Sequence, residues 1–414
     1  MHLEIPALCV DCGEASKEGH VDRRSVLKGL GGVMVLAAGG GIYRASDQGV
    51  FSVGEGPAYE PWHTWDADSA SGPLAIVHAG VLAANPHNTQ PWLFHVAENR
   101  IDLYADPSRY LGAMDYFGRE MHIGLGCAIA NMKLAAAQGY RASARSSIGK
   151  TYIKDRSDPV IVATLKLEQQ ENITPDPLFD QIPFRHTNRG PYDTGRPLDS
   201  KVLSEMLSLV PEGRGISLKL FADEAEKKAV GNTIVKATEA IVANHDMVMA
   251  SDAWFRHDWD ELQQKRDGVT LDAAGMPASI TAVAKMLPES DPETGHEYWL
   301  GATRDVHVPT AAAYGVFAVR DLYSRPLNML VGEYWQRLHL SATAKGLAAQ
   351  PLNQPLEIFD YAVAQRKKVK PEWRLDGLFE KGWHPTFCFR FGYPEQPANA
   401  SPRRRLLDVV RQKV

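Results

Sequence analysis

Apolar residues recur along the chain at two spacings, one typical of helices and one typical of strands. The helical spacing predicts helices over 73–83, 118–139, 200–209, 224–244 and 332–347. Short apolar runs between turn residues predict strands over 92–96, 100–105, 160–167, 216–222 and 387–392. The first two strands flank Glu98-Asn99, as in a hairpin. Because helices and strands recur in both halves of the chain, we expect an α+β fold.

The two halves share a short sequence at the end of a long helix. Ala135-Ala136-Ala137-Gln138-Gly139-Tyr140 resembles Ala342-Thr343-Ala344-Lys345-Gly346-Leu347, and each glycine stands where a helix C-cap is expected. A single match of this length is equally compatible with an internal duplication and with two helices that end alike by coincidence.

Residues 251–309 differ in character from the rest of the second half. They mix Trp254, Trp259 and Trp299 with the turn Asp267-Gly268, which indicates an insertion with its own turns. A long insertion in a compact fold is often an active-site cover, so we expect a lid, with a plain surface excursion as the alternative.

The N-terminal region has the order of an export signal. Arg23-Arg24 precede the apolar, glycine-rich run 29–42, and this arrangement resembles a twin-arginine signal. The run is shorter than the ~20 residues that span a bilayer as a helix. We therefore expect residues 1–45 to be recognised by the twin-arginine translocation machinery, and the mature protein to be soluble and periplasmic or otherwise extracytoplasmic. The alternative is a basic helix start packed on the domain.

Composition and charge exclude several classes of protein. With 44% hydrophobic residues among 414, the chain can bury a full core. Its net charge of −5 offers no general basic field for nucleic acid. Cys9-Val10-Asp11-Cys12 has a metal-like spacing, but no second Cys or His pair lies near it, so we expect no metal site. The fingerprints of P-loop, zinc-protease and serine-hydrolase enzymes are absent from the sequence, and Gly29-Leu30-Gly31 does not complete a dinucleotide fingerprint.

Two polar segments carry the candidate chemistry. Asn85-Pro86-His87-Asn88-Thr89-Gln90-Pro91 is a turn that cannot continue the preceding helix, and Arg185-His186-Thr187-Asn188-Arg189 opens the second half. Arginine and backbone amides suit a phosphate, whereas Asn and Gln side chains suit a hydroxyl-bearing chain or a ring edge. Each segment taken alone is equally compatible with an ordinary helix terminator or a solvated basic turn.

Together the two segments resemble the nitroreductase family. Residues 84–92 are similar to its Ser/Asn-x-x-Asn-x-Gln-Pro-Trp loop, and residues 185–189 are similar to its Arg-x-Ser/Thr-x-Lys/Arg motif. Phe391-Gly392-Tyr393-Pro394, followed by Ser401-Pro402-Arg403-Arg404, is a weaker match. The arginine motif of ordinary nitroreductases precedes the loop, whereas here it follows by about a hundred residues. This order resembles the Acg-type branch, in which two nitroreductase-like halves are fused in one chain.

The resemblance, which covers about residues 73–412, implies a fold and a cofactor. The fold is nitroreductase-like α+β, with two halves (46–180 and 181–414, the latter with the insertion) that each contain an antiparallel sheet flanked by helices. The cofactor is FMN, held between the arginine motif of one half and the loop of the other. The chain would then be an internal pseudo-dimer that can exist as a monomer. The cofactor-binding residues implied are Asn85, Pro86, His87, Asn88, Gln90, Arg185, His186, Thr187, Arg189, Arg403 and Arg404.

The resemblance also implies separate roles for the arginines. Arg185 would bind the phosphate, Arg403 or Arg404 would add a second phosphate contact, and Arg189 would lie near N1 and the C2 carbonyl of the ring, where it favours the reduced flavin. No catalytic acid or base is assigned, because hydride transfer to a flavin needs none, and His87 and His186 are expected to pack or to form hydrogen bonds.

The implied activity is that of an FMN-dependent oxidoreductase. It would accept hydride from a small-molecule donor and reduce a nitro, quinone or similar acceptor. One alternative is an FMN-binding or FMN-sequestering protein whose insertion closes the site. Another is a structural exported domain that has lost its flavin.

Overall fold

The computed structural model describes residues 40–65, 72–147, 155, 157–170, 173–211 and 213–411. Nearly all of the expected export signal precedes residue 40, so that prediction and the Cys9–Cys12 motif lie outside the described residues. In the part of the chain that is described, no helix combines the length and the apolar character needed to cross a membrane.

The first sheet has five strands. Its four main strands are β1 (Trp92–Ala97), β2 (Arg100–Ala105), β4 (Val160–Gln169) and β3 (Tyr140–Ser146), which lie side by side in that order and pair antiparallel. The fifth is the two-residue strand β11 (Val410–Arg411), which pairs parallel with β1. The C-terminal end of the chain therefore returns to the sheet of the first half.

The second sheet repeats this arrangement. Its strands are β5 (Ile216–Phe221), β8 (Ala313–Val319), β10 (His384–Gly392) and β9 (Ala348–Pro351), again antiparallel and again in the order first, second, fourth, third along the chain. The prediction of an α+β fold with two sheets, as expected of fused halves, is confirmed. Among the described strands of these two sheets, the pairing of β11 with β1 is parallel and the others are antiparallel.

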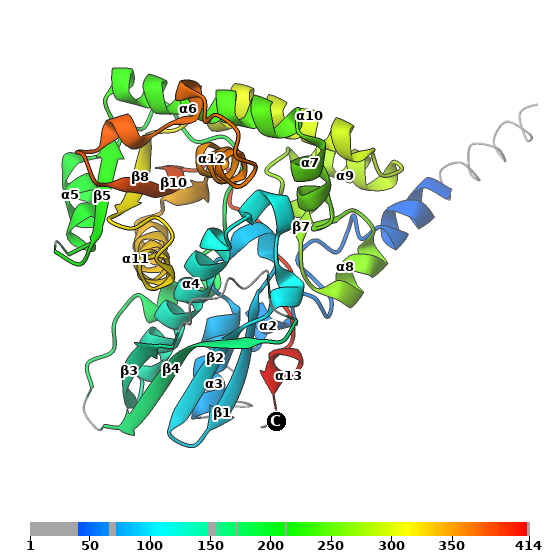
Figure 1. The fold of residues 1–414 in the computed structure, drawn as a ribbon. Coiled ribbons are helices and arrows are strands. Elements are labelled where there is room, and N and C mark those ends of the chain that lie inside the picture. The colour runs from blue at the N-terminus through cyan, green and yellow to red at the C-terminus, as the bar shows by residue number, and fades with distance from the viewer. Residues whose placement is uncertain are drawn as a thin grey trace, which may run out of the picture.

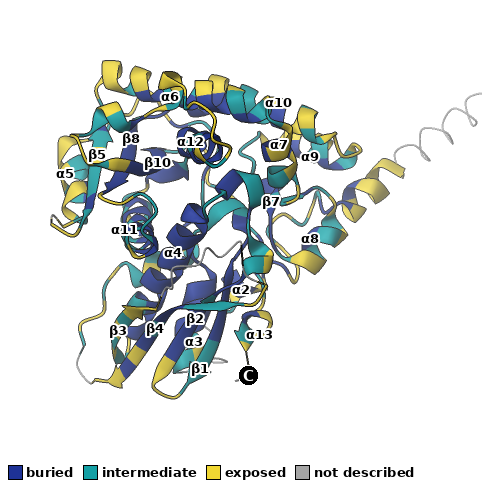
Figure 2. Ribbon diagram, in the orientation of Figure 1, coloured by how far each residue is buried: buried dark blue, intermediate teal, exposed yellow. Residues whose placement is uncertain are grey.

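Helices occupy matching places in the two halves. α3 (Pro73–Val81) precedes the first strand of the first sheet, and α5 (Ser200–Ser208) precedes that of the second. α4 (Arg119–Ala136) and α11 (Arg325–Ala344) each follow the second strand of their sheet, and they lie together between the two sheets (Figure 1). Both central helices are largely buried, whereas the outer helices of the second half are exposed on one face (Figure 2).

The two central helices cross at a pair of glycines. A Cβ added to Gly126 would lie 1.9 Å from the carbonyl oxygen of Met329, and one added to Gly332 would lie 1.9 Å from that of Ile123. The contact is reciprocal, with the same offset in both pairs (329 − 123 = 332 − 126 = 206). An approximate twofold axis therefore passes through this crossing, and neither position admits a side chain.

The halves differ most in the connection between the first and second strands. In the first half, β1 and β2 are joined by the tight Glu98-Asn99 turn, whereas residues 222–312 separate β5 from β8. This excursion is longer than the predicted 251–309. It begins with α6 (Glu224–Val242), which matches the helix predicted over 224–244. It then contains short helices that the sequence analysis did not identify, namely α7 (His245–Asp252), α8 (Trp259–Lys265), α9 (Ala278–Met286) and α10 (Pro292–Ala302), with a parallel pair β6 (Phe255–Arg256) and β7 (Val269–Thr270).

Three other short helices complete the described elements that bear on the site. α2 (Glu60–His63) lies in the N-terminal segment, α12 (Gln354–Ala364) connects β9 to β10, and α13 (Leu406–Val409) precedes β11. α12 and the strands β3, β8 and β9 were not predicted from the sequence. β8 is buried at all seven positions, as expected for an inner strand.

Candidate functional site

The two polar segments, distant in sequence, meet at one cavity. Thr187 forms a parallel bridge with Ala349 of β9, which places the arginine segment at the edge of the second sheet. The loop 85–90 lies between α3 and β1. The space between them measures about 340 Å³ when the open solvent at its mouth is included, and about 30 Å³ of it admits the centre of a water-sized sphere. Its lining residues are Trp62, Ala84, Asn85, Asn88, Arg185, His186, Thr187, Arg189, Ser401 and Arg403.

Seven of the eleven predicted cofactor-binding residues line this cavity, and four do not. Pro86, His87, Gln90 and Arg404 lie outside the lining. Arg403 and Arg404 are neighbours on a segment without helix or sheet structure, yet only Arg403 faces the cavity. The sequence left these two arginines as alternatives, and the geometry favours Arg403.

The loop 85–90 has an unusual backbone. His87, Asn88 and Gln90 adopt φ values of 46°, 54° and 49°, in the left-handed region that is costly for residues other than glycine. Asn85 closes the turn, since its Oδ1 accepts a hydrogen bond of 2.7 Å from the backbone N–H of Gln90. Such a conformation persists only where surrounding contacts hold it.

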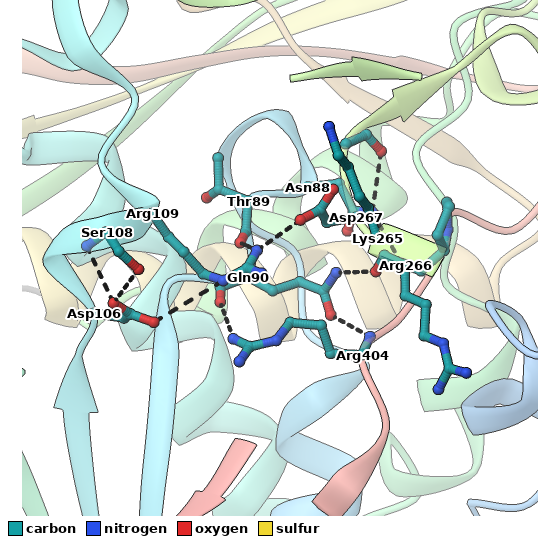
Figure 3. A network of polar contacts seen from close by, with 12 residues as sticks. Asn88, Thr89, Gln90, Asp106, Ser108, Arg109, Lys265, Arg266, Asp267 and Arg404 are labelled. Atoms are coloured by element: carbon teal, nitrogen blue, oxygen red, sulfur yellow. Dashed lines mark hydrogen bonds and ion pairs between the residues drawn. The ribbon is translucent and has the colours of Figure 1, made fainter. Parts of the chain in front are cut away.

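Those contacts come from the insertion and from the C-terminal segment. Nδ2 of Asn88 donates to the carbonyl oxygens of Gly268 (3.1 Å) and Pro402 (2.9 Å). Gln90 lies between two chain segments (Figure 3): its Nε2 donates to the carbonyl of Arg266 (2.7 Å), and its Oε1 accepts from the N–H of Arg404 (2.8 Å). The Asn and Gln side chains that were expected to contact a cofactor therefore also fasten their own loop.

The buried carboxylate of Asp267 connects the insertion to the same loop through an ion pair with Arg109. Asp267 is 4% exposed and forms ion pairs of 2.9 Å with Arg109 and with Arg256. Arg109 also donates to the carbonyl of Thr89 (2.7 Å), as Figure 3 shows. Asp267 was predicted as a turn residue of the lid-like insertion, whereas Arg109 and Arg256 were not predicted as part of the site. Their sequence signal is weak because they come from three separate segments.

The insertion also reaches the arginine segment. Nη1 of Arg189 donates to the carbonyl of Ala273 (2.9 Å), and a Cβ on Gly275 would lie 2.3 Å from the carbonyl carbon of Arg189. Residues 266–275 thus touch both motif segments. Whether they act as a lid stays a prediction.

Two arginines in the cavity are buried without a carboxylate partner in the described part of the chain. Arg185 and Arg403 are 2% and 3% exposed, and the Nε atom of each has no hydrogen-bond partner. The guanidinium of Arg185 donates to the carbonyl of Leu82 (3.1 Å). That of Arg403 donates to Oδ1 of Asn88 (2.6 Å) and to the carbonyls of Pro402 (2.8 Å), Ala83 (3.3 Å) and Ser401 (3.5 Å). Burial lowers the pKa of Arg185 to about 10, and burial together with the charge of Arg185 lowers the pKa of Arg403.

A third buried arginine shows what a satisfied guanidinium looks like. Arg390 of β10 is fully buried, and its nitrogens donate to Gln350, His307, Thr310 and Gly190 at 2.6–3.0 Å. Its hydrogen bond to the carbonyl of Gly190 holds the chain just after the arginine segment. Among the described residues, Arg185 has a single hydrogen-bond acceptor and the Nε–H of Arg403 has none, so most donors of Arg185 and the Nε–H of Arg403 are available to an anion.

Histidines near the cavity are neutral at pH 7. Burial, followed by the charge of nearby arginines, lowers the pKa of His87 to about 3 and that of His186 to about 3. His87 Nε2 lies 3.1 Å from Oγ of Ser251, and His186 packs edge-on against Trp62 at 4.7 Å between ring centroids. Within the described ranges, no three His, Cys, Asp or Glu side chains converge as metal ligands.

Trp62 and Ser401 line the cavity but were not predicted. Nε1 of Trp62 donates to the carbonyl of Ser401 (2.8 Å), and the guanidinium of Arg403 lies 4.7 Å from the centre of the Trp62 ring. Trp62 belongs to the four-residue helix α2 and carries no local pattern that could have marked it. The N-terminal segment is therefore one wall of the cavity.

Comparison with known proteins gives distant similarities. No protein-family model matches the chain. The chain is 26% identical over 372 residues to the "Putative NAD(P)H nitroreductase Rv3131" of Mycobacterium tuberculosis, which covers 86% of this chain and 95% of that protein. It is 24% identical over 343 residues to the "Putative NAD(P)H nitroreductase acg" of the same species, covering 81% and 94%.

Two solved structures align with more than half of the chain. The FMN and NADPH-dependent nitroreductase NfnB from Sphigopyxis sp. strain HMH aligns with a TM-score of 0.36 and 14% identity, over 57% of this chain and 99% of that one. A nitroreductase with bound FMN from Desulfitobacterium hafniense DCB-2 aligns with a TM-score of 0.34 and 10% identity, over 58% and 100%.

Proposed function

We propose that this chain, a distant homologue of the nitroreductase family, binds FMN in the cavity and uses it to reduce a nitro, quinone or similar acceptor. The observation that carries the proposal is the pair of buried guanidiniums of Arg185 and Arg403. A pKa of about 10 leaves Arg185 charged at pH 7, and none of the charges that shift either pKa is a carboxylate. Buried charge of one sign requires a counter-charge, and a phosphate supplies it.

The residues of the cavity fit the parts of FMN. Arg185 and Arg403 would hold the phosphate through charge-assisted hydrogen bonds. The second amide N–H of Asn85 would lie along the hydroxyl-bearing chain, whereas both amide hydrogens of Asn88 are already donated to Gly268 and Pro402. Arg189 has no carboxylate partner among the described residues and keeps a pKa of about 10. A fixed positive charge there would favour the reduced ring. When bound, FMN would supply hydride acceptance and donation, an exchange that needs no proton from the neutral rings of His87 and His186.

A single site per chain follows from the pseudo-symmetry. The loop that matches residues 85–90 in the second half precedes β5, and its sequence Leu209-Val210-Pro211 continues to Gly213-Arg214-Gly215 without an Asn or Gln side chain. The second half therefore lacks the polar loop needed for a second site. We infer one FMN per chain, in a species that can be monomeric.

A second candidate function is FMN sequestration. It is favoured by the contacts of residues 266–275 with both motif segments, because a segment fastened by the buried ion pairs of Asp267 opens less readily than a loose loop. In that case the site would bind FMN but exclude an electron donor and an acceptor.

The absorption spectrum of the purified protein tests the proposal. We expect a flavin spectrum, FMN and not FAD after acid release, and one FMN per chain by combined light scattering and absorbance. Bleaching by NADH or NADPH and reoxidation by a quinone or nitro compound would support the oxidoreductase, and bleaching by dithionite alone would support sequestration. Absence of flavin after reconstitution with FMN contradicts both.

A further inference from the structure

Trp62 joins the N-terminal segment to the segment that carries Arg403. Its indole Nε1 donates to the carbonyl of Ser401 at 2.8 Å, and the backbone N–H of Arg403 donates to the carbonyl of Ala58 at 2.7 Å. These two hydrogen bonds run in opposite directions, so the two segments are held to one another at two points. The side chains of Trp62 and Arg403 therefore start from backbones that are fixed relative to each other.

The ring of Trp62 also contacts the charge of Arg403 directly. The central carbon of the guanidinium lies over the indole ring, 4.7 Å from its centre. A cation within about 6 Å of the centre of an aromatic ring is attracted by its face, and the attraction is strongest where water is excluded. Trp62 is 7% exposed and Arg403 is 3% exposed, so little water reaches this contact.

Hydrogen-bond acceptors hold the same guanidinium at its Nη atoms. Nη1 of Arg403 donates to Oδ1 of Asn88 (2.6 Å) and to the carbonyl of Pro402 (2.8 Å), and Nη2 donates to the carbonyl of Ala83 (3.3 Å). The Nε–H is buried without a partner. An aliphatic side chain in place of Trp62 would remove a contact that limits the movement of the whole group while these acceptors stay in place.

The segment that carries Trp62 is itself fastened to the insertion. Oε1 of Gln263 in α8 accepts from the backbone N–H of Ala58 (2.9 Å), and Nε2 of the same side chain donates to the carbonyl of Glu55 (3.0 Å). Gly56 between them adopts a φ of 83°, and a Cβ there would lie 2.8 Å from Oε1 of Gln263. The place of Trp62 is therefore set by contacts with a second element, as a positioning side chain requires.

Trp62 also reaches the arginine segment. The ring of His186, the residue next to Arg185, packs against it at 4.7 Å between ring centroids, with an angle of 70° between the ring planes. One side chain of the N-terminal segment therefore touches both of the segments that supply arginines to the cavity.

We propose that Trp62 is a positioning residue for the anion site: its ring and its indole N–H together keep the guanidinium of Arg403 in the place where it meets the phosphate. The proposal rests on the proposed function, because it takes the phosphate of FMN as the anion. Trp62 lines the cavity, so direct contact between its ring and the flavin is the competing explanation. That explanation predicts equal effects on the binding of FMN and of riboflavin, which lacks the phosphate.

Matched variants separate these explanations. Trp62→Leu removes the aromatic face and the N–H, so the Kd for FMN should rise about tenfold, whereas the Kd for riboflavin should change less than about twofold. Trp62→Phe keeps an aromatic face and should recover most of the FMN affinity. Trp65→Leu is the control, because Trp65 packs against Phe179 (5.0 Å between ring centroids) and lies outside the cavity lining; it should leave the ratio of the two Kd values unchanged. Equal losses of FMN and riboflavin affinity in Trp62→Leu would overturn the positioning role.

A double variant tests whether Trp62 acts through Arg403. In the Arg403→Ala background the ring has no guanidinium to hold, so Trp62→Leu should change the FMN Kd less than about twofold. A merely structural role of Trp62 would produce the same loss in either background, and that result would overturn the proposal. Should Trp62→Leu not fold, Trp62→Met, with a longer and more flexible side chain that also lacks an aromatic face, takes its place in both comparisons.

Binding of inorganic phosphate to the full chain separates this inference from the proposed function. If the wild type binds phosphate but not FMN, the proposed function fails, and the positioning role is tested by the phosphate Kd, which should again be about tenfold higher in Trp62→Leu. Equal phosphate Kd values in this variant and the wild type would overturn the positioning role. If neither ligand binds, both proposals fail.

Discussion

Two buried charge clusters lie where the halves meet, and they are balanced in opposite ways. The basic cluster consists of Arg185 and Arg403 and has no carboxylate. The acidic cluster joins α4 to α12 and places four carboxyl groups around one guanidinium, that of Arg119. Its carboxyl groups, all 7% exposed or less, belong to Asp115, Glu120, Glu357 and Asp360.

The acidic cluster neutralises itself. Arg119 forms an ion pair of 2.8 Å with Asp360 and one of 3.8 Å with Glu120. Burial raises the pKa of Asp115 to about 7 and that of Glu120 to about 8, and burial with the charge of Glu120 raises the pKa of Glu357 as well. Protons therefore replace the missing cations at neutral pH.

The basic cluster cannot lose its excess charge through a change of protonation. An arginine whose pKa falls to about 10 still carries its charge at pH 7, so protons cannot remove the excess. An excess of buried carboxyl groups can therefore be neutralised by bound protons. An excess of buried arginines cannot, and it indicates an anion from outside the chain. Four experiments test this contrast.

The largest expected effect is on stability, and its sign should differ between the clusters. Arg119→Met removes the one cation of the acidic cluster and should lower the free energy of unfolding by about 3–5 kcal/mol. Arg185→Met removes an uncompensated charge and should leave the stability of the FMN-free protein unchanged or raised. Urea unfolding of the two variants beside the wild type measures both. Equal losses in the two variants would show that the clusters are not different in kind.

The next effect concerns FMN affinity. Arg185→Ala and Arg403→Ala should each weaken FMN binding about a hundredfold, which corresponds to roughly 2–3 kcal/mol for a charge-assisted contact. Arg404→Ala is the matched neighbour, because its side chain lies outside the cavity; it should weaken binding much less. Titration of FMN into each apo-variant decides the matter, and a larger loss for Arg404→Ala than for Arg403→Ala would reverse the assignment.

The acidic cluster should make stability depend on pH. The pKa of Glu120 is raised from 4.5 to about 8 on folding, so between these values the folded chain binds more protons than the unfolded chain, and stability falls as pH rises through this window. Glu120→Gln mimics the neutral acid and should reduce that fall by on the order of 2 kcal/mol. Unfolding at pH 5, 7 and 8.5 tests it, with the exposed Glu226→Gln as control. An undiminished fall in Glu120→Gln would falsify the proton-sharing account.

The smallest expected effect on binding is that of Arg189. Arg189→Ala should lose less FMN affinity than Arg185→Ala but should make the bound flavin harder to reduce, because a positive charge that favours the reduced ring is gone. Spectroelectrochemical titration against a reference dye measures the midpoint potential. If the potential is unchanged while affinity falls as in Arg185→Ala, Arg189 binds the phosphate and not the ring.

Much of the architecture could be predicted from local sequence. The helices α3, α4, α5 and α6 and the strands β1, β2, β5 and β10 lie where the apolar spacing predicts them, because each has a long or regular apolar pattern of its own. The short helices of the insertion were missed although Asn244, Asp258 and Asp291 cap three of them with side-chain hydrogen bonds. A cap of one residue is a weak signal without a long apolar face behind it.

Residue types and motifs were enough to identify the candidates for an anion site, since Arg185, Arg403 and the polar loop are recognisable from the sequence. They could not show that Arg403 and not Arg404 faces the cavity, that Trp62 forms a wall of it, or that the ion pairs of Asp267 help to hold the loop. These facts depend on contacts between segments up to several hundred residues apart. The local balance of charge also depends on the three-dimensional arrangement. The sequence shows only a net charge of −5, whereas the fold brings charged residues together in one cluster whose charges are balanced and one whose charges are not.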